Sequence, residues 1–237
     1  TKDLLENDYR VIVLDKKKDK LKEIKSNKNL IFIKVDLNKT NSFQNLIKNL
    51  IKKYGEIFGL INNVRAGKQL SLENETIKNW NLTLSVNLKA SFFLSQNFIK
   101  FKKTKKYHSK IINISSIADE LVTGQSPSYH CSKAALKILT KYLSIYSSKK
   151  KIIVNSISPG FIIKNRSKHY FEGTKITKKN QILSNAHPSN RVGNENDISK
   201  LILFLLSENS NFINGENIKV DGGITGKENI NFLKNYI

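Results

Sequence analysis

Short apolar runs alternate with longer amphipathic segments along most of this chain. The apolar runs predict strands over residues 10–14, 30–35, 57–61, 110–114, 152–157 and 217–220. Between them, apolar side chains recur at helical spacing and predict helices over residues 16–26, 41–54, 75–101, 127–148 and 196–207. The third of these helices is expected to be broken or kinked around Asn87. Strands that alternate with helices are typical of a parallel sheet with crossover helices, so the pattern predicts an α/β fold.

The length favours a single domain over residues 1–237, which is enough chain for a sizeable core. No apolar run reaches the roughly 18 residues that a membrane-spanning helix needs. The first residues do not have the pattern of a signal peptide. Cys131 is the only cysteine, which excludes an internal disulfide and fits a reducing cytoplasm. We therefore expect a cytoplasmic protein with no membrane segment.

The balance of charge is strongly basic. Lysine and arginine number 41 against 19 aspartate and glutamate residues, a formal net charge of +22. Such a balance suits nucleic acid or another anionic partner. Here, however, the lysines are scattered among many asparagines and isoleucines, as an AT-rich genome would encode, and no basic stripe interleaved with aromatic residues appears. The composition therefore argues against nucleic-acid binding as the main function.

Tyr129 and Lys133 stand four residues apart inside an expected helix, in Ser128-Tyr129-His130-Cys131-Ser132-Lys133. Positions i and i+4 share one helix face, so the ammonium is expected beside the phenol. A free tyrosine has a pKa of about 10 and is a poor base at neutral pH, and a neighbouring cation favours its ionised form. Ser116, thirteen residues earlier, is a neutral donor for a substrate oxygen. The plain alternative is a surface tyrosine and lysine on an ordinary helix.

Further motifs surround this pair in a fixed order. They are Asn62-Asn63, Asn87 in Ser85-Val86-Asn87-Leu88, the strand Ile111-Ile112-Asn113-Ile114-Ser115-Ser116, Ser158-Pro159-Gly160-Phe161-Ile162 and Val220-Asp221-Gly222-Gly223. In this order and at these intervals, the segments closely resemble the short-chain dehydrogenase/reductase family over residues 4–223. The resemblance implies a Rossmann-like, doubly wound parallel sheet in three α/β/α layers, and an NAD(P)-dependent oxidoreductase.

The family mechanism carries over to four residues. Tyr129 is implied to exchange a proton with the hydroxyl or carbonyl oxygen of the substrate, and Ser116 to hydrogen-bond that oxygen. Lys133 is implied to bind the nicotinamide ribose and to favour the ionised tyrosine. Asn87 is implied to hold a water molecule in a proton relay through Lys133. The four histidines show no metal-ligand spacing, so no metal is expected.

Asp15 bears on the choice between NAD and NADP. The resemblance places it at the end of a strand where a carboxylate accepts hydrogen bonds from both ribose hydroxyls and repels a 2′-phosphate. Lys16, Lys17 and Lys18 follow directly and favour a phosphate instead. The position of Asp15 makes NAD the expected cofactor, with NADP as the alternative.

The resemblance implies further cofactor contacts at other strand ends. Asp36 would contact the adenine edge, and Asn62 would lie beside the adenosine ribose. Ile162, after Pro159 and Gly160, would bind the nicotinamide amide through its backbone.

The start of the chain departs from the family fold. A doubly wound dinucleotide-binding sheet opens with a strand, a glycine-rich turn and a helix whose N-terminus holds the pyrophosphate. Here residues 4–13 resemble the end of that helix and the second strand, so the first strand and the glycine-rich turn are expected to be missing from this chain. Because the first strand is central, a gap is expected in the sheet.

Two further departures lie near the expected cleft. Val64 and Arg65 are extra residues between Asn62-Asn63 and Ala66-Gly67, which brings Arg65 close to the cofactor cleft. Lys164 occupies a place where a threonine often contacts the cofactor. The segment 164–190 is rich in lysine and suits an anionic substrate, such as a nucleotide sugar or an acyl-carrier thioester. The lysine bias of the whole chain explains it equally well.

The sequence thus predicts an enzyme that interconverts a secondary alcohol and a carbonyl, on a sugar-derived or other anionic substrate. The alternatives are an enzyme like 3-oxoacyl-carrier-protein reductase and a truncated, non-catalytic binding paralogue. Helices 75–101 and 127–148 resemble those that form dimer faces in the family. Leu136, Leu139 and Leu143 form a row that needs cover, so a homodimer or homotetramer is expected.

Overall fold

The computed structural model describes residues 1–237 except 19–20, 22–23, 25–26, 105, 164–183 and 228–237. The main strands pair in parallel throughout. They are β1 (Val11–Asp15), β2 (Leu30–Lys34), β3 (Gly59–Asn62), β4 (Ser109–Ile114), β5 (Ile152–Pro159) and β8 (Asn217–Val220). Valine and isoleucine dominate several of them because branched side chains pack well on a pleated surface. Each strand begins and ends within two residues of its expected range, so the α/β fold is confirmed.

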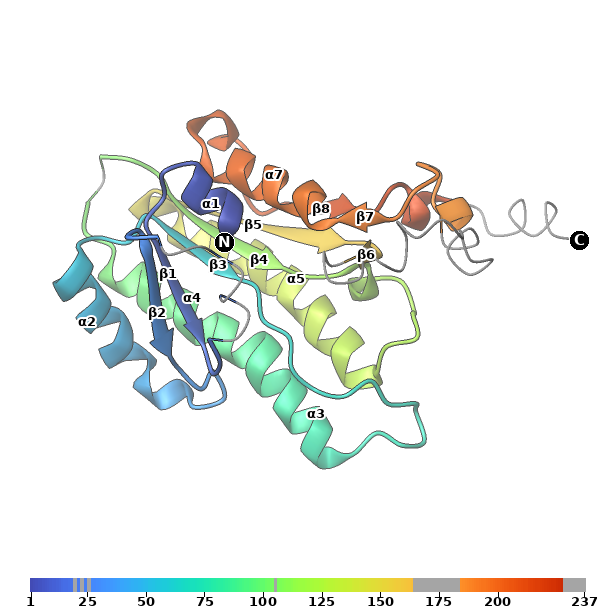
Figure 1. Cartoon of the computed structure of the whole chain (residues 1–237). Coiled ribbons are helices and arrows are strands. Elements are labelled where there is room, and N and C mark those ends of the chain that lie inside the picture. The colour runs from blue at the N-terminus through green and yellow to red at the C-terminus, as the bar shows by residue number, and fades with distance from the viewer. Residues whose placement is uncertain (19–20, 22–23, 25–26, 105, 164–183, 228–237) are drawn as a thin grey trace, which may run out of the picture.

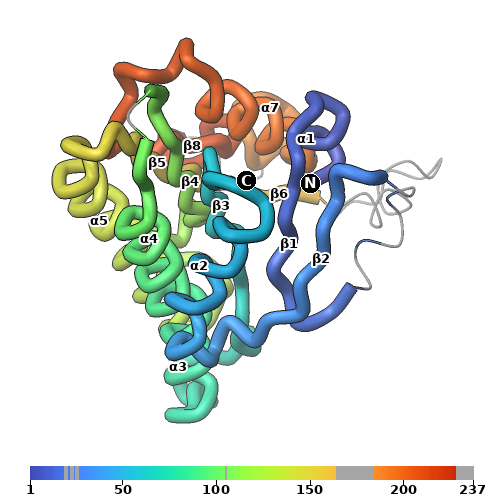
Figure 2. Tube along the Cα trace, turned by 90° about the vertical axis from the view of Figure 1, so that its left-hand side faces the viewer, coloured from blue at the N-terminus to red at the C-terminus, as the bar shows by residue number. Residues whose placement is uncertain are grey.

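The parallel strands form two separate groups. β3, β4, β5 and β8 make one sheet in that order, and in the described part of the chain β1 pairs only with β2. Figure 2 shows this pair standing beside β3. Among the described residues no hydrogen-bonded ladder joins β1 to β3, so the opening lies where the sequence predicts a gap. A short pair, β6 (Ile162–Ile163) and β7 (Gly193–Asn194), lies outside both groups.

Helices cover both faces of the strands. They are α1 (Lys2–Glu6), α2 (Phe43–Tyr54), α3 (Ile77–Leu84), α4 (Ala90–Phe101), α5 (Pro127–Ser147) and α7 (Glu195–Leu206). Figure 1 shows α1 and α7 on one side and α2 to α5 on the other, which is the three-layer arrangement expected. The helix expected over 16–26 falls largely outside the described residues. In the part of the chain that is described, no helix is long and apolar enough to cross a membrane.

The alternation of side chains along β4 joins the two halves of the core. Ile111 packs with Phe98 of α4 and Leu143 of α5, whereas its neighbour Ile112 packs with Leu205 of α7 on the opposite face. Successive residues of a strand point to opposite faces, so one apolar run serves both layers. This central strand holds α5, the helix with the candidate site, against the sheet.

The long helix expected over 75–101 is broken at the expected place. A π turn over Ser85–Lys89 separates α3 from α4, and Asn87 lies within it, fully buried. A π turn widens the helix locally and is frequent at functional sites. Here it presents the side chain of Asn87 to α5.

Candidate active site

All the parallel strands end at one edge of the molecule, and the expected site residues gather there. Asp15 ends β1, Asn62 ends β3 and Pro159 ends β5. Asp36 lies just beyond β2 and Ser116 just beyond β4. Ligands of open α/β sheets bind outside the carboxyl ends of the strands. The topology therefore places these separate motifs on the edge where a dinucleotide would lie.

Tyr129 and Lys133 share one face of α5, as their spacing predicts. The Nζ atom of Lys133 lies 5.7 Å from the centre of the Tyr129 ring and donates a hydrogen bond of 2.7 Å to the main-chain oxygen of Ile114. Lys133 is buried. Burial, and next the positive charge of Arg65, lower the pKa of Lys133 to about 8, while Asp119 acts in the opposite direction. The hydrogen bond to Ile114 thus fixes the position of the Lys133 amine, while its surroundings weaken its hold on the proton.

Ser116 lies between the end of β4 and the start of α5. Its Oγ accepts a hydrogen bond of 3.2 Å from the main-chain nitrogen of Ala118 and caps the short turn Ile117–Asp119. The preceding Ser115 donates 3.1 Å to the main-chain oxygen of Lys133. The two serines therefore differ in role. Ser115 attaches the loop to α5, whereas the hydroxyl hydrogen of Ser116 is available to another acceptor.

Asn87 joins the loop after β3 to the helix that carries Tyr129. Its Oδ1 accepts 2.9 Å from the main-chain nitrogen of Ala66, and its Nδ2 donates 3.1 Å to the Oγ of Ser132. Ser132 in turn donates 2.8 Å to the main-chain oxygen of Tyr129. The side chain that is expected to hold a relay water connects the loop after β3, at Ala66, to α5.

Asn62 faces the interior. It is 3% exposed, and its Nδ2 donates 2.7 Å to Asn113 and 3.1 Å to Ser95. Asn113 continues the network by donating 2.9 Å to Thr140 of α5. The amide of Asn62 therefore ties β3 to β4 and α4, and its backbone is the part at the strand edge.

Asp15 and Asp36 differ in how they are engaged. The Nζ of Lys16 lies 3.0 Å from a carboxylate oxygen of Asp36. A hydrogen bond from the main chain of Asn38, followed by that from Lys16, lowers the pKa of Asp36. Asp15 accepts a hydrogen bond of 3.2 Å from the main-chain nitrogen of Lys17. Lys16 thus pairs with an acid across the strand ends, and the carboxylate of Asp15 has no cationic partner among the described ion pairs.

Pro159 and Gly160 bring β5 against the end of β8. The nitrogen of Gly160 donates 2.9 Å to the oxygen of Val220. A Cβ atom at Gly160 would stand 2.7 Å from the Cα of Asp221, so only glycine fits this approach. Ile162 follows in β6, paired with Gly193. The tight turn at Gly160 directs the chain to the place where Ile162 was expected to act.

The structure also adds groups whose role the sequence motifs did not indicate. The guanidinium carbon of Arg65 lies 5.3 Å from the centre of the Tyr129 ring. Asp119 is buried and accepts 2.5 Å from Ser158 and 3.1 Å from Asn217. Arg65 is detectable in the sequence as an insertion, whereas Asp119 carries no signal beyond following Ser116 closely. Most of the basic segment 164–190, including Lys164, lies outside the described residues.

A family model described as enoyl-(acyl carrier protein) reductase matches residues 1–225. The 3-oxoacyl-(acyl-carrier-protein) reductase FabG of Buchnera aphidicola subsp. Baizongia pistaciae is 32% identical over 196 residues, covering 83% of this chain and 78% of the relative. The 2-dehydro-3-deoxy-D-gluconate 5-dehydrogenase of Dickeya dadantii is 29% identical over 188 residues, 79% and 73% of the two chains.

Solved structures agree in fold. A 4-hydroxyisoleucine dehydrogenase complexed with NADH has a TM-score of 0.85 and 28% identity, covering 96% of this chain and 93% of the other. ElxO with NADP bound has a TM-score of 0.83 and 26% identity, covering 95% and 92%. The family match spans nearly the whole chain, and its relatives are oxidoreductases that use either nicotinamide dinucleotide. This chain therefore belongs to the short-chain dehydrogenase/reductase family and is an NAD(P)-dependent oxidoreductase of that type.

Proposed function

We propose that the enzyme interconverts a secondary alcohol and a carbonyl, with Tyr129 as the acid/base. The observation that carries this proposal is the placement of Tyr129 over a buried, hydrogen-bonded Lys133 beside the end of β4. A phenol exchanges protons effectively near neutral pH only where a fixed positive charge favours its ionised form. Another buried lysine, Lys102, lies 4.0 Å from the centre of the Tyr107 ring, but it is paired with Glu56 and that tyrosine precedes the start of β4, away from the edge where the site residues gather.

Each polar group has a distinct task in the proposed reaction. In alcohol oxidation the hydroxyl proton passes to Tyr129, and in carbonyl reduction Tyr129 returns a proton to the oxygen. Ser116 donates a hydrogen bond to that oxygen. Asn87 holds Ala66 and, through Ser132, the main chain of Tyr129 in position. The nicotinamide dinucleotide, when bound, donates or accepts the hydride.

We propose NAD as the preferred cofactor. The carboxylate of Asp15 lies at the end of β1, where it favours free ribose hydroxyls over a 2′-phosphate. Lys16 is the closest of the three lysines along the chain, and its ammonium is already paired with Asp36. This ion pair weakens the attraction of Lys16 for a 2′-phosphate, because the carboxylate of Asp36 offsets its charge. Relatives of known structure include complexes with NADH and with NADP, so this choice rests on the residues of this chain.

We propose that the substrate is a small anionic molecule. The similar dehydrogenase from Dickeya dadantii acts on a sugar acid by its name, and a 4-hydroxyisoleucine dehydrogenase has been solved with NADH and succinate. An acyl-carrier thioester is the second candidate, because FabG enzymes are among the relatives. A small keto acid and acetoacetyl-CoA, compared as substrates with NADH, separate the two. Turnover of neither compound would contradict the proposed substrate class. Undiminished turnover of any active substrate by Tyr129→Phe would contradict the proposed acid/base role.

We propose that the enzyme assembles through the outer face of α5. Leu136 and Leu143 of the expected row are buried within the chain, so the prediction that this row needs an external cover is wrong for these two. A different row is exposed instead. It consists of Ile138, Tyr142, Ile145 and Tyr146, each more than half exposed.

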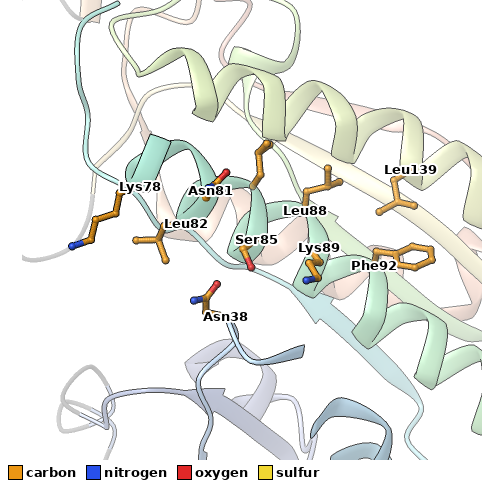
Figure 3. Close-up of a pocket in the computed structure, with 10 residues that line it drawn as sticks. Asn38, Lys78, Asn81, Leu82, Ser85, Leu88, Lys89, Phe92 and Leu139 are labelled. Carbon is orange, nitrogen blue, oxygen red and sulfur yellow. The ribbon is translucent and has the colours of Figure 1, made fainter. Parts of the chain in front are cut away.

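A hollow beside this face makes it suitable for a second copy. Figure 3 shows Leu88, Phe92 and Leu139 lining it, from the π turn, α4 and α5. Exposed apolar patches of this kind mark interaction sites, and the two long helices carrying it resemble the dimer faces of the family. A homodimer or homotetramer is the assembly proposed, and the lone Cys131 fits work in the cytoplasm.

A further inference from the structure

The inserted residue Arg65 places a second cation on the proposed acid/base residue. Its guanidinium carbon lies 5.3 Å from the centre of the Tyr129 ring, within the range of a cation–π contact. The residue is exposed, whereas Lys133, the cation on the same ring, is buried and donates to Ile114. Of the two, only Arg65 is accessible to a dissolved substrate.

Most of the hydrogen-bonding capacity of Arg65 remains available. A guanidinium carries five N–H donors in a planar fork. Among the described residues one of these donors is engaged, in a hydrogen bond of 2.7 Å from Nη2 to Oε1 of Gln125. Within the same part of the chain no acidic side chain forms an ion pair with it. Gln125 and the tyrosine ring thus hold the fork in place without neutralising it.

The position of Arg65 separates it from the adenosine end of the cofactor. Asp15 and Asp36 mark that end, beyond β1 and β2, whereas Tyr129 marks the reacting end. A cation on the ring of Tyr129 therefore lies at the reacting end of the site, where the substrate would bind. It lies away from the adenosine ribose and from any 2′-phosphate on that ribose. A guanidinium matches the geometry of a carboxylate through two parallel hydrogen bonds.

We infer that Arg65 binds a carboxylate of the substrate and so orients the neighbouring carbinol or carbonyl carbon toward Tyr129. This inference rests on the proposed function, because it takes Tyr129 as the reacting group. It narrows the substrate to a hydroxy or keto carboxylic acid. The residue acts on binding and orientation, and it takes no proton in the reaction.

Succinate and its uncharged analogue succinamide test this inference by titration calorimetry at low salt, with and without NADH. Net hydrogen bonds to charged groups support a preference for succinate of about tenfold or more. Arg65→Gln should remove the preference, and Arg65→Lys should keep part of it because charge remains without the fork. Lys68→Gln, at an exposed lysine on the same loop, is the matched control and should keep the full preference.

The outcomes separate this inference from the proposed function. Equal binding of the two compounds by the unmodified enzyme, or a preference that survives Arg65→Gln, overturns the role of Arg65. Tyr129→Phe should keep the preference for succinate and lose turnover. A Tyr129→Phe enzyme with normal turnover would overturn the acid/base assignment, while the titrations would still decide the role of Arg65.

Discussion

The Nζ atom of Lys133 lies 2.7 Å from the main-chain oxygen of Ile114, the last residue of β4. This bond joins the end of the central strand to the face of α5 that carries Tyr129. Because the Lys133 amine is buried and hydrogen-bonded to Ile114, it has little freedom to move away from the phenol of Tyr129. A local spacing on one helix and a contact with a distant strand together produce the arrangement that the proposed chemistry needs.

Replacing Tyr129 by phenylalanine should reduce turnover by about a hundredfold or more, the usual scale of general acid/base assistance. Affinity for NADH should change little, because the role proposed for the hydroxyl is toward the substrate. Steady-state kinetics and NADH fluorescence titration measure the two effects. Tyr54→Phe, at the end of α2, is a matched control that should leave both values unchanged. Near-normal turnover of Tyr129→Phe would refute the assignment.

The charge of Lys133 should depend on pH in an unusual range. Its pKa in the folded enzyme is lowered from 10.5 to about 8, mainly by burial. The cost of burying the charged form is therefore fully present below about pH 8 and disappears between pH 8 and 10.5. Relative to Lys133→Met, the unmodified enzyme should gain stability as pH rises through this window. Melting temperatures of the two proteins across the window test it, and parallel curves would contradict it.

Arg65 and Asp119 should shift the titration of Lys133 in opposite directions. The charge of Arg65 lowers the pKa of Lys133 and that of Asp119 raises it. Arg65→Gln should therefore move the pKa upward, and Asp119→Asn should move it downward. The titration of the Lys133 side-chain nitrogen, followed by NMR, reports both shifts directly. Shifts of the same sign in the two variants would show that indirect rearrangement dominates.

Cofactor preference should follow Asp15. The unmodified enzyme is expected to bind NADH more tightly than NADPH, and Asp15→Ala should narrow the difference. Asp36→Asn should also favour NADPH, because it frees Lys16 from its carboxylate partner. Fluorescence titrations with both cofactors measure this preference, and Lys28→Ala serves as a control because Lys28 precedes the start of β2, at the opposite edge of the strands from Asp15. A clear preference of the unmodified enzyme for NADPH would show that the lysines after Asp15 dominate.

The exposed face of α5 should control the oligomeric state. Light scattering at micromolar concentration should give at least the mass of a dimer, and Tyr142→Glu should lower it toward the monomer, since a charge there would be buried against the second copy. Lys149→Glu, beyond the end of the helix, is the charge-change control. A monomeric mass for the unmodified protein would refute the proposed assembly.

The opening between β1 and β3 should respond to a strand added in front of Thr1. Grafting the first strand, glycine-rich turn and helix start of a relative should raise the melting temperature and strengthen NADH binding. Each backbone group that gains a partner in the buried sheet contributes about 1–3 kcal/mol relative to remaining unsatisfied. A glycine-serine extension of equal length is the control. Equal melting temperatures and equal NADH affinity in the two extended proteins would show that the opening is of no consequence.

The sequence by itself determined the local structure. Apolar runs and helical spacing were sufficient to predict the strands, four of the five expected helices and the kink at Asn87, because each depends on neighbours within a few residues. The same holds for Tyr129 and Lys133, whose spacing of four places them on one face of any α-helix. The gap in the sheet was also predictable, since it follows from which motifs are present.

Only the tertiary structure decided which of two apolar rows on α5 faces inward. Leu136 and Leu143 are buried, and Ile138 and Tyr142 are exposed, although both rows have helical spacing. The structure alone likewise turned Asn62 inward to Asn113 and brought Arg65 onto Tyr129. These relationships join residues 51 and 64 positions apart in the chain. Periodicity carries no information over such separations, because the packing of whole elements sets those contacts.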